Sequence, residues 1–94
     1  MAHELRYSEV AISQLKKLRT ADRTAILKEI EQVLAINPTL ESKARVKLLR
    51  QPAPTMYRLR VGAFRVFYDI EGEAVLIVQV LTKDDAIAYL EKPQ

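Results

Sequence analysis

The chain has 94 residues, of which 49% are hydrophobic and 29% charged, and its formal net charge is +3. This length predicts a single domain, residues 1–94, and the apolar fraction predicts a compact core rather than a disordered tail. The absence of cysteine excludes disulfides and thiolate metal sites and fits a cytoplasmic protein. No apolar signal segment opens the sequence, and the longest apolar run, residues 74–78, is too short to span a bilayer, so no membrane association is expected.

The charges are unevenly distributed along the chain. Residues 42–68 contain no Asp or Glu and carry a charge of +7, whereas the remainder carries −4. Such segregation predicts a positive surface suited to a polyanion, although a solvated face that keeps the protein soluble is the alternative. The basic residues of this segment are Lys43, Arg45, Lys47, Arg50, Arg58, Arg60 and Arg65.

The first half of the chain predicts a strand and two helices. Residues 3–7 partly alternate and predict the strand. Ser8 is a suitable N-cap for a helix over residues 8–18, and Asp22 for a second helix that ends near Asn37, ahead of Pro38. Apolar residues at helical spacing support both helices. The short link between them predicts an antiparallel hairpin.

The second half predicts mainly strands. Residues 38–44 form a connector, residues 45–50 are either a short extended segment or loop, and the prolines within residues 51–54 interrupt regular structure. Strands are expected at residues 56–61, 64–70 and 74–81, and Asp84 or Asp85 is expected to cap a short final helix. The order β-α-α-β-β-β-α predicts an α+β fold, in which an antiparallel sheet carries an N-terminal helical hairpin on one face and a short C-terminal helix.

A two-residue turn at Gly62 and Ala63 places the arginines together. It pairs Arg60 with Arg65, and alternation puts both on the face opposite the apolar side chains of the same strands. Like charges directly across a sheet destabilise it by a few tenths to about 1 kcal/mol, so the pairing does not stabilise the fold. Two arginines in this position are instead suited to binding a phosphate group. The alternative is a solvent-facing sheet with Asp69 and Glu73 as counterions. We name this face, which bears Arg58, Arg60, Arg65 and Phe67, the arginine face.

The next turn leaves two registers open. A three-residue turn at residues 71–73 places Gln79 opposite Arg65 and brings Leu81 and Lys83 to the arginine face. A two-residue turn places Val78 beside Arg65 and Gln79 in the core. We prefer the first register, because a buried Gln79 without partners is costly.

Several segments together resemble a known family. They are the helical hairpin, Lys47-Leu48-Leu49-Arg50, the motif Tyr-Arg-Leu-Arg-Val-Gly-x-x-Arg-Val-x-Tyr at residues 57–68, and a hydrophobic strand that leads to Lys83 with a tyrosine six residues on. Over nearly the whole chain this pattern resembles the RelE/ParE superfamily of toxins from type II toxin–antitoxin systems, and the strand motif is its specific part. The resemblance implies the RelE-like fold, whose concave sheet face cuts messenger RNA in the ribosomal A site.

The resemblance also implies roles for individual residues. Arg58 and Arg60 match basic residues that orient or deprotonate the 2′-hydroxyl and hold phosphate, and Arg65 matches the arginine that stabilises the transition-state phosphate. Lys83 takes the place of a basic residue that protonates the leaving 5′-oxygen, and Tyr89 that of a tyrosine that stacks on a base. Further RNA contacts are expected from Lys43, Arg45, Lys47, Arg50, Phe67 and Gln79.

The expected activity is therefore that of a ribosome-dependent mRNA endoribonuclease that inhibits translation. It cleaves through the 2′-hydroxyl with no metal and no cofactor. Its expected partners are the ribosome, mRNA in the A site and a small, acidic, RelB-like antitoxin.

The chain departs from the family pattern near its C-terminus. Thr82-Lys83-Asp84-Asp85 replaces a His-Arg pair common in relatives and puts acid near the leaving group, and Tyr89 is equally suited to a core position. A ParE-like inhibitor of DNA gyrase and a catalytically degenerate antitoxin-binding member therefore remain as alternatives.

Overall fold

The computed structural model describes residues 2–42 and 44–92. The elements in chain order are β1 (Glu4–Tyr7), α1 (Glu9–Lys16), α2 (Thr20–Glu29), the π-helical turn η1 (Ile30–Leu34), β2 (Val46–Leu48), β3 (Tyr57–Val61), β4 (Phe64–Glu71), β5 (Ala74–Thr82) and α3 (Lys83–Glu91). The segment at residues 45–50, which the sequence left open between strand and loop, therefore contains a short strand.

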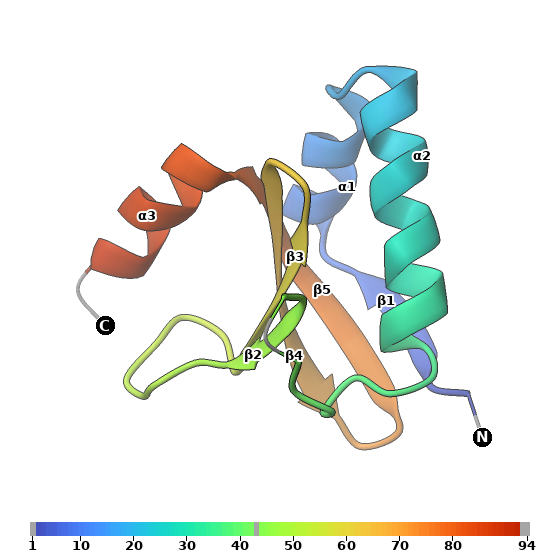
Figure 1. Cartoon of the computed structure of the whole chain (residues 1–94), viewed down its shortest axis with the longest axis vertical. Helices are drawn as coiled ribbons and strands as arrows, with labels where there is room; N and C mark the ends of the chain where they lie inside the picture. Colours follow the sequence, from blue (N-terminus) through green and yellow to red (C-terminus); the bar gives the residue numbers. More distant parts are fainter. Residues whose placement is uncertain (1, 43, 93–94) are drawn as a thin grey trace.

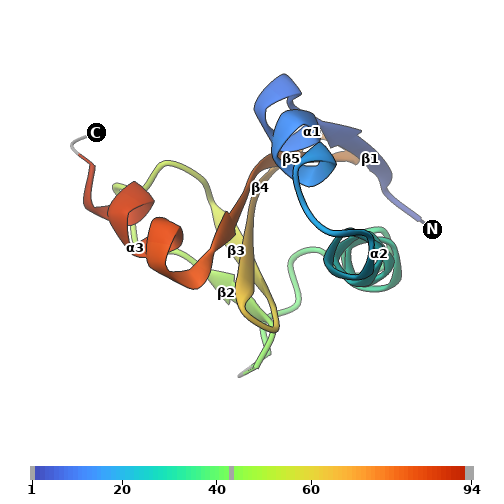
Figure 2. The same cartoon turned by 90° about the horizontal axis from the view of Figure 1, so that it is seen from above.

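The strands form one five-stranded sheet in the order β1-β5-β4-β3-β2. β1 runs parallel to β5, and the other neighbours are antiparallel. The expected α+β architecture is confirmed, but the sheet is not wholly antiparallel, because the edge strand β1 pairs in parallel with β5. α1 and α2 lie on one face of the sheet and α3 on the other (Figures 1 and 2).

The first helix is capped as its sequence predicts. The Ser8 side chain accepts a hydrogen bond from the Ala11 N–H at 3.0 Å, and its hydroxyl donates to the Val78 carbonyl of β5 at 2.8 Å. At the far end of α1, the Arg23 guanidinium donates to the carbonyls of Leu15 and Leu18. Ser8 and Arg23 thereby satisfy backbone groups that a helix leaves unpaired at its ends.

The other two predicted caps are wrong. α2 begins at Thr20, two residues ahead of Asp22, which lies in the first turn and forms an ion pair with Arg19 at 3.5 Å. α3 begins directly after β5, and its cap is Thr82, whose hydroxyl accepts from the Asp85 N–H at 3.2 Å. Lys83 is consequently the first residue of a helix and not the last of a strand.

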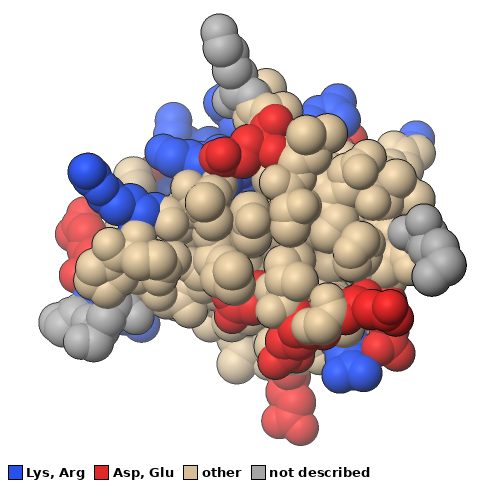
Figure 3. All heavy atoms as spheres, turned by 90° about the horizontal axis from the view of Figure 1, so that it is seen from below, with Lys and Arg blue, Asp and Glu red and all other residues tan. Residues whose placement is uncertain are grey.

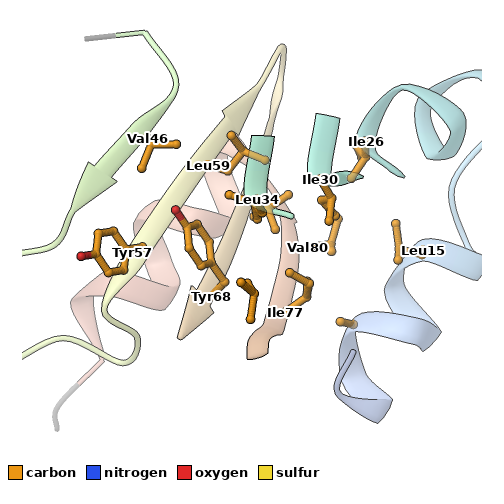
Figure 4. Packing of buried hydrophobic residues seen from close by; sticks show 13 residues of the cluster. Leu15, Ile26, Ile30, Leu34, Val46, Tyr57, Leu59, Tyr68, Ile77 and Val80 are labelled. Carbon is orange, nitrogen blue, oxygen red and sulfur yellow. The ribbon is translucent and has the colours of Figure 1, made fainter. Parts of the chain in front are cut away.

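The main core lies between the sheet and the helical hairpin (Figure 4). Tyr68 is fully buried, stacks on Tyr57 with the ring centroids 5.4 Å apart, and donates its hydroxyl to the Pro38 carbonyl at 2.6 Å. This contact attaches the connector after η1 to the centre of the sheet. The buried residues of this core are Ala11, Leu15, Ile26, Ile30, Leu34, Val46, Tyr57, Leu59, Val66, Tyr68, Val75, Ile77 and Val80.

The register between β4 and β5 differs from the preferred one. The turn has two residues, since Glu71 pairs with Ala74, and Arg65 lies opposite Leu81 rather than Gln79. A bulge follows the pair of Tyr68 with Ile77, and Gln79 then pairs with Phe67. This irregularity returns Gln79 to the arginine face, so the expected face is right and the expected turn is wrong.

Candidate functional site

Three neighbouring strands bring four basic residues to the arginine face. β2 contributes Lys47, which pairs with Arg58 of β3, and Arg60 of β3 pairs with Arg65 of β4, as the turn at Gly62 predicts. Within residues 2–42 and 44–92, no carboxylate lies within 4.0 Å of any of these four cations. The acidic counterions of the alternative interpretation are therefore absent from these four cations; the Asp69 carboxylate instead accepts the Met56 N–H at 2.7 Å.

The arginines disturb one another electrostatically. Burial lowers the pKa of Arg58, and the charges of Arg65 and Arg60 lower it further. Burial also lowers the pKa of Arg65, with a contribution from Arg60. The Arg58 Nε atom is buried without a hydrogen-bond partner. A site in which cations repel and are incompletely solvated gains free energy when an anion binds.

Arg65 is more deeply placed than its sequence position suggests. The residue is only 7% exposed, and its Nη1 atom donates to the carbonyls of Gly62 at 2.9 Å and Phe64 at 2.8 Å. Gly62 has a φ of 56°, in the left-handed region that the two-residue turn requires. The guanidinium is thus fixed against the turn between β3 and β4.

Phe67 does not lie open on the arginine face. It has no exposed surface, because α3 folds back over this part of the sheet. Its ring meets that of Tyr89 at a centroid distance of 5.0 Å and an angle of 62°. In this arrangement Phe67 offers no surface to RNA, and its contact with RNA stays a prediction. Phe67, Leu49 and Ala86 form a second, smaller core with Ala53, Leu81 and Tyr89 at its edge.

Lys83 and Tyr89 lie on α3. The Lys83 side chain is exposed, and its N–H donates to the Ala63 carbonyl at 2.9 Å, which anchors the start of the helix at the turn that Arg65 also holds. Tyr89 is half-buried; burial raises its pKa, and the negative charge of Asp69 adds to this rise. Tyr89 therefore packs against the small core, whether or not it also stacks on a base.

The remaining expected RNA contacts are dispersed. Arg45 and Arg50 are exposed, and Arg45 forms an ion pair with Glu29 at 3.6 Å. Lys47 and Arg58 line a cavity of about 490 Å³ together with Glu41 and Ser42. Lys43 lies outside the described residues.

In Figure 3, Lys and Arg gather on one flank of the molecule and most Asp and Glu atoms on another.

Gln14 of α1 is a polar residue of this region that sequence reasoning missed. Its Nε2 atom donates to Gln79 Oε1 at 2.7 Å, and its Oε1 atom accepts the Val80 N–H at 2.5 Å. Gln14 reaches β5 where the short β1 has ended and leaves that edge unpaired. No local pattern reveals a pairing between residues so far apart in sequence.

The fold and the arginine motif define the class of protein. The structure is similar to the free E. coli toxin RelE carrying two arginine-to-alanine substitutions, with 20% identity, 96% of this chain and 95% of that chain covered, and a TM-score of 0.71. It is also similar to the Mycobacterium tuberculosis RelBE2 toxin–antitoxin complex, with 22% identity, 88% of this chain and 100% of that chain covered, and a TM-score of 0.70. For the intact E. coli RelBE complex the identity is 25%, the coverage is 86% of this chain and 96% of that chain, and the TM-score is 0.66. These likenesses place the fold among the RelE toxins.

A profile of the family described as ParE toxin of type II toxin-antitoxin system, parDE, matches residues 5–87. The chain therefore belongs to this family, within the RelE/ParE superfamily of type II toxins. No curated protein matches its sequence significantly. Among the described residues, no helix has the length and apolarity needed to cross a membrane.

Proposed function

We propose that this toxin acts in the cytoplasm as an endoribonuclease that cuts messenger RNA on the ribosome. The observation that carries the proposal is the cluster of Lys47, Arg58, Arg60 and Arg65 on three adjacent strands without a carboxylate counterion. The cluster destabilises the fold in isolation, and a bound phosphodiester would relieve that repulsion.

The proposed reaction uses the RNA's own 2′-hydroxyl. Its oxygen attacks the adjacent phosphorus as its proton passes to solvent water, and the bond to the 5′-oxygen breaks, which leaves a 2′,3′-cyclic phosphate and a 5′-hydroxyl. Arg58 and Arg60 hold the phosphate. Arg65, already fixed against the turn, stabilises the charge that develops on it. Lys83, at the start of α3 beside that turn, supplies the proton to the departing oxygen. The ribosome aligns the RNA, so positioning replaces a dedicated base.

The test is induction of the toxin followed by primer extension on several transcripts. The expected result is cleavage of translated messages with 5′-hydroxyl ends, which Lys83→Ala abolishes. Lys28→Ala removes the same charge from an exposed position on α2, behind the sheet, and should leave cleavage unchanged. Tyr89→Phe should cost less than Tyr89→Ala, because stacking on a base is worth about 1–3 kcal/mol and needs no hydroxyl.

A ParE-like action on DNA gyrase is the second candidate. The matched family and the burial of Phe67 and Arg65 favour it, because they reduce the part of the arginine face that is open to RNA. Intact messages together with accumulated double-strand DNA breaks after induction would establish this function and refute the nuclease.

We further propose that the partner is a small, acidic, RelB-like antitoxin, as the complexes formed by the similar RelE proteins suggest. A disordered anionic segment that orders over Lys47, Arg58 and Arg60 would bind tightly and lose affinity as salt rises. Co-expression with the adjacent gene, followed by calorimetry at several salt concentrations, tests this. Binding that is independent of salt would contradict it.

A further inference from the structure

A small cavity lies between α3 and β5, at the edge of the arginine face. Its volume is about 210 Å³. Asp85, Ala88 and Tyr89 share the face of α3 that lines it, because they are spaced three and four residues apart. Strand β5 contributes Gln79 and Leu81. The lining residues are Gln79, Leu81, Asp85, Ala88, Tyr89 and Lys92.

The orientation of the Gln79 amide follows from a chain of hydrogen bonds. The Val80 N–H can only donate, so the Gln14 atom that it meets is the oxygen, and the Gln14 NH₂ group must be the one that faces Gln79. Gln79 therefore presents its oxygen to Gln14. Its own NH₂ group makes no hydrogen bond to any residue in the described part of the chain and remains a donor at the cavity.

The other polar group at the cavity has the opposite character. The Asp85 carboxylate only accepts hydrogen bonds, and within the described ranges it makes no ion pair or side-chain hydrogen bond. Tyr89 supplies an aromatic surface whose position is fixed by its contact with Phe67. The lining of the cavity thus includes the Gln79 donor, the anionic Asp85 acceptor and the Tyr89 ring, besides the basic residue Lys92.

We propose that this cavity binds a guanine base of the RNA and that Asp85 and Gln79 determine the base preference, an inference that rests on the proposed action on RNA. Guanine presents the O6 acceptor beside two N–H donors, N1–H and N2–H. Gln79 donates to O6, and the carboxylate of Asp85 accepts from both donors. Adenine, cytosine and uracil offer the carboxylate at most one such donor group beside an acceptor. A good bidentate pair discriminates by about tenfold or more.

The experiment measures binding of short oligouridine RNAs that carry A, C, G or U at one central position, by fluorescence anisotropy at fixed salt. The unmodified chain should prefer G by about tenfold. Asp85→Asn should abolish the preference. Asp84→Asn, which makes the same charge change at a neighbouring exposed position that does not line the cavity, should keep it.

Gln79→Glu provides an independent variant. It retains an oxygen for Gln14 but replaces the donor with an acceptor, so the preference for G should also be lost. Equal binding of all four RNAs by the unmodified chain, or a preference that survives Asp85→Asn, would overturn the cavity proposal and leave the action on RNA standing. Failure to bind any of the RNAs would also overturn the cavity proposal, whereas the ribosome-dependent cleavage is decided separately by primer extension.

Discussion

Arg65 combines a charge at the candidate site with a structural task. Its guanidinium donates to two carbonyls of the turn between β3 and β4, so Arg65→Ala leaves both without this partner. We expect the variant to lose about 1–3 kcal/mol of unfolding free energy, offset by up to about 1 kcal/mol from relief of the repulsion with Arg60. The repulsion across the pair, taken alone, predicts unchanged or slightly higher stability.

Urea unfolding measures this difference. The matched control is Arg60→Ala, which removes the other member of the pair from an exposed position whose side chain makes no hydrogen bond to the described residues. It relieves the same repulsion without losing a hydrogen bond, so it should leave stability unchanged or raise it by up to about 1 kcal/mol. Equal unfolding free energies for the two variants would show that the hydrogen bonds from Arg65 to the turn carbonyls do not stabilise the fold.

Tyr68 predicts a response to alkaline pH. Burial raises its pKa above the ordinary value of about 10, with a smaller contribution from Tyr57. A raised pKa in the folded state means that the tyrosine contributes its full stability below pH of about 10 and loses it as pH rises further. Unfolding free energy should therefore fall in this alkaline range.

The variant Tyr68→Phe should reduce that slope. At neutral pH it should cost about 1–2 kcal/mol, because the buried Pro38 carbonyl loses its donor. Unfolding curves at several pH values measure both effects. A slope as steep as that of the unmodified chain would show that another group titrates.

Among the elements, α3 is held by few buried contacts. Ala86 is its buried residue, whereas Ile87 and Leu90 are 52% and 41% exposed. We expect backbone amides of α3 to exchange hydrogen faster than those of β4 and β5, because local opening exposes little apolar surface. Tyr89→Ala should accelerate exchange in α3 alone, and Ile87→Ala should not. Hydrogen exchange followed by NMR distinguishes these outcomes; uniform acceleration would mean that α3 opens only with the whole fold.

At the scale of the molecule, the segregation of charge predicts a salt-dependent affinity for single-stranded RNA. Each phosphate neutralised contributes about −0.7 to the slope of log K against log salt. Lys47→Ala should make that slope shallower by about this amount, whereas Lys28→Ala, behind the sheet, should not change it. Titrations at several salt concentrations measure both slopes, and equal changes would show that RNA has no specific contact with Lys47.

The sequence by itself determined the features that depend on neighbouring residues. Ser8 caps α1, Gly62 permits the two-residue turn, and alternation along the strands that follow puts Arg60 opposite Arg65. The same local rules predicted the α+β order and the arginine face. These predictions succeeded because a cap, a turn and a strand are each decided within a few residues.

Only the tertiary structure decided what depends on distant contacts. β1 lies parallel to β5, the bulge after Ile77 sets the face of Gln79, and α3 folds over Phe67 and makes it core. Gln14 fixes the amide of Gln79, which is 65 residues away. Each outcome follows from packing and hydrogen bonding between segments far apart in the chain. Local propensity and periodicity carry no information about such contacts.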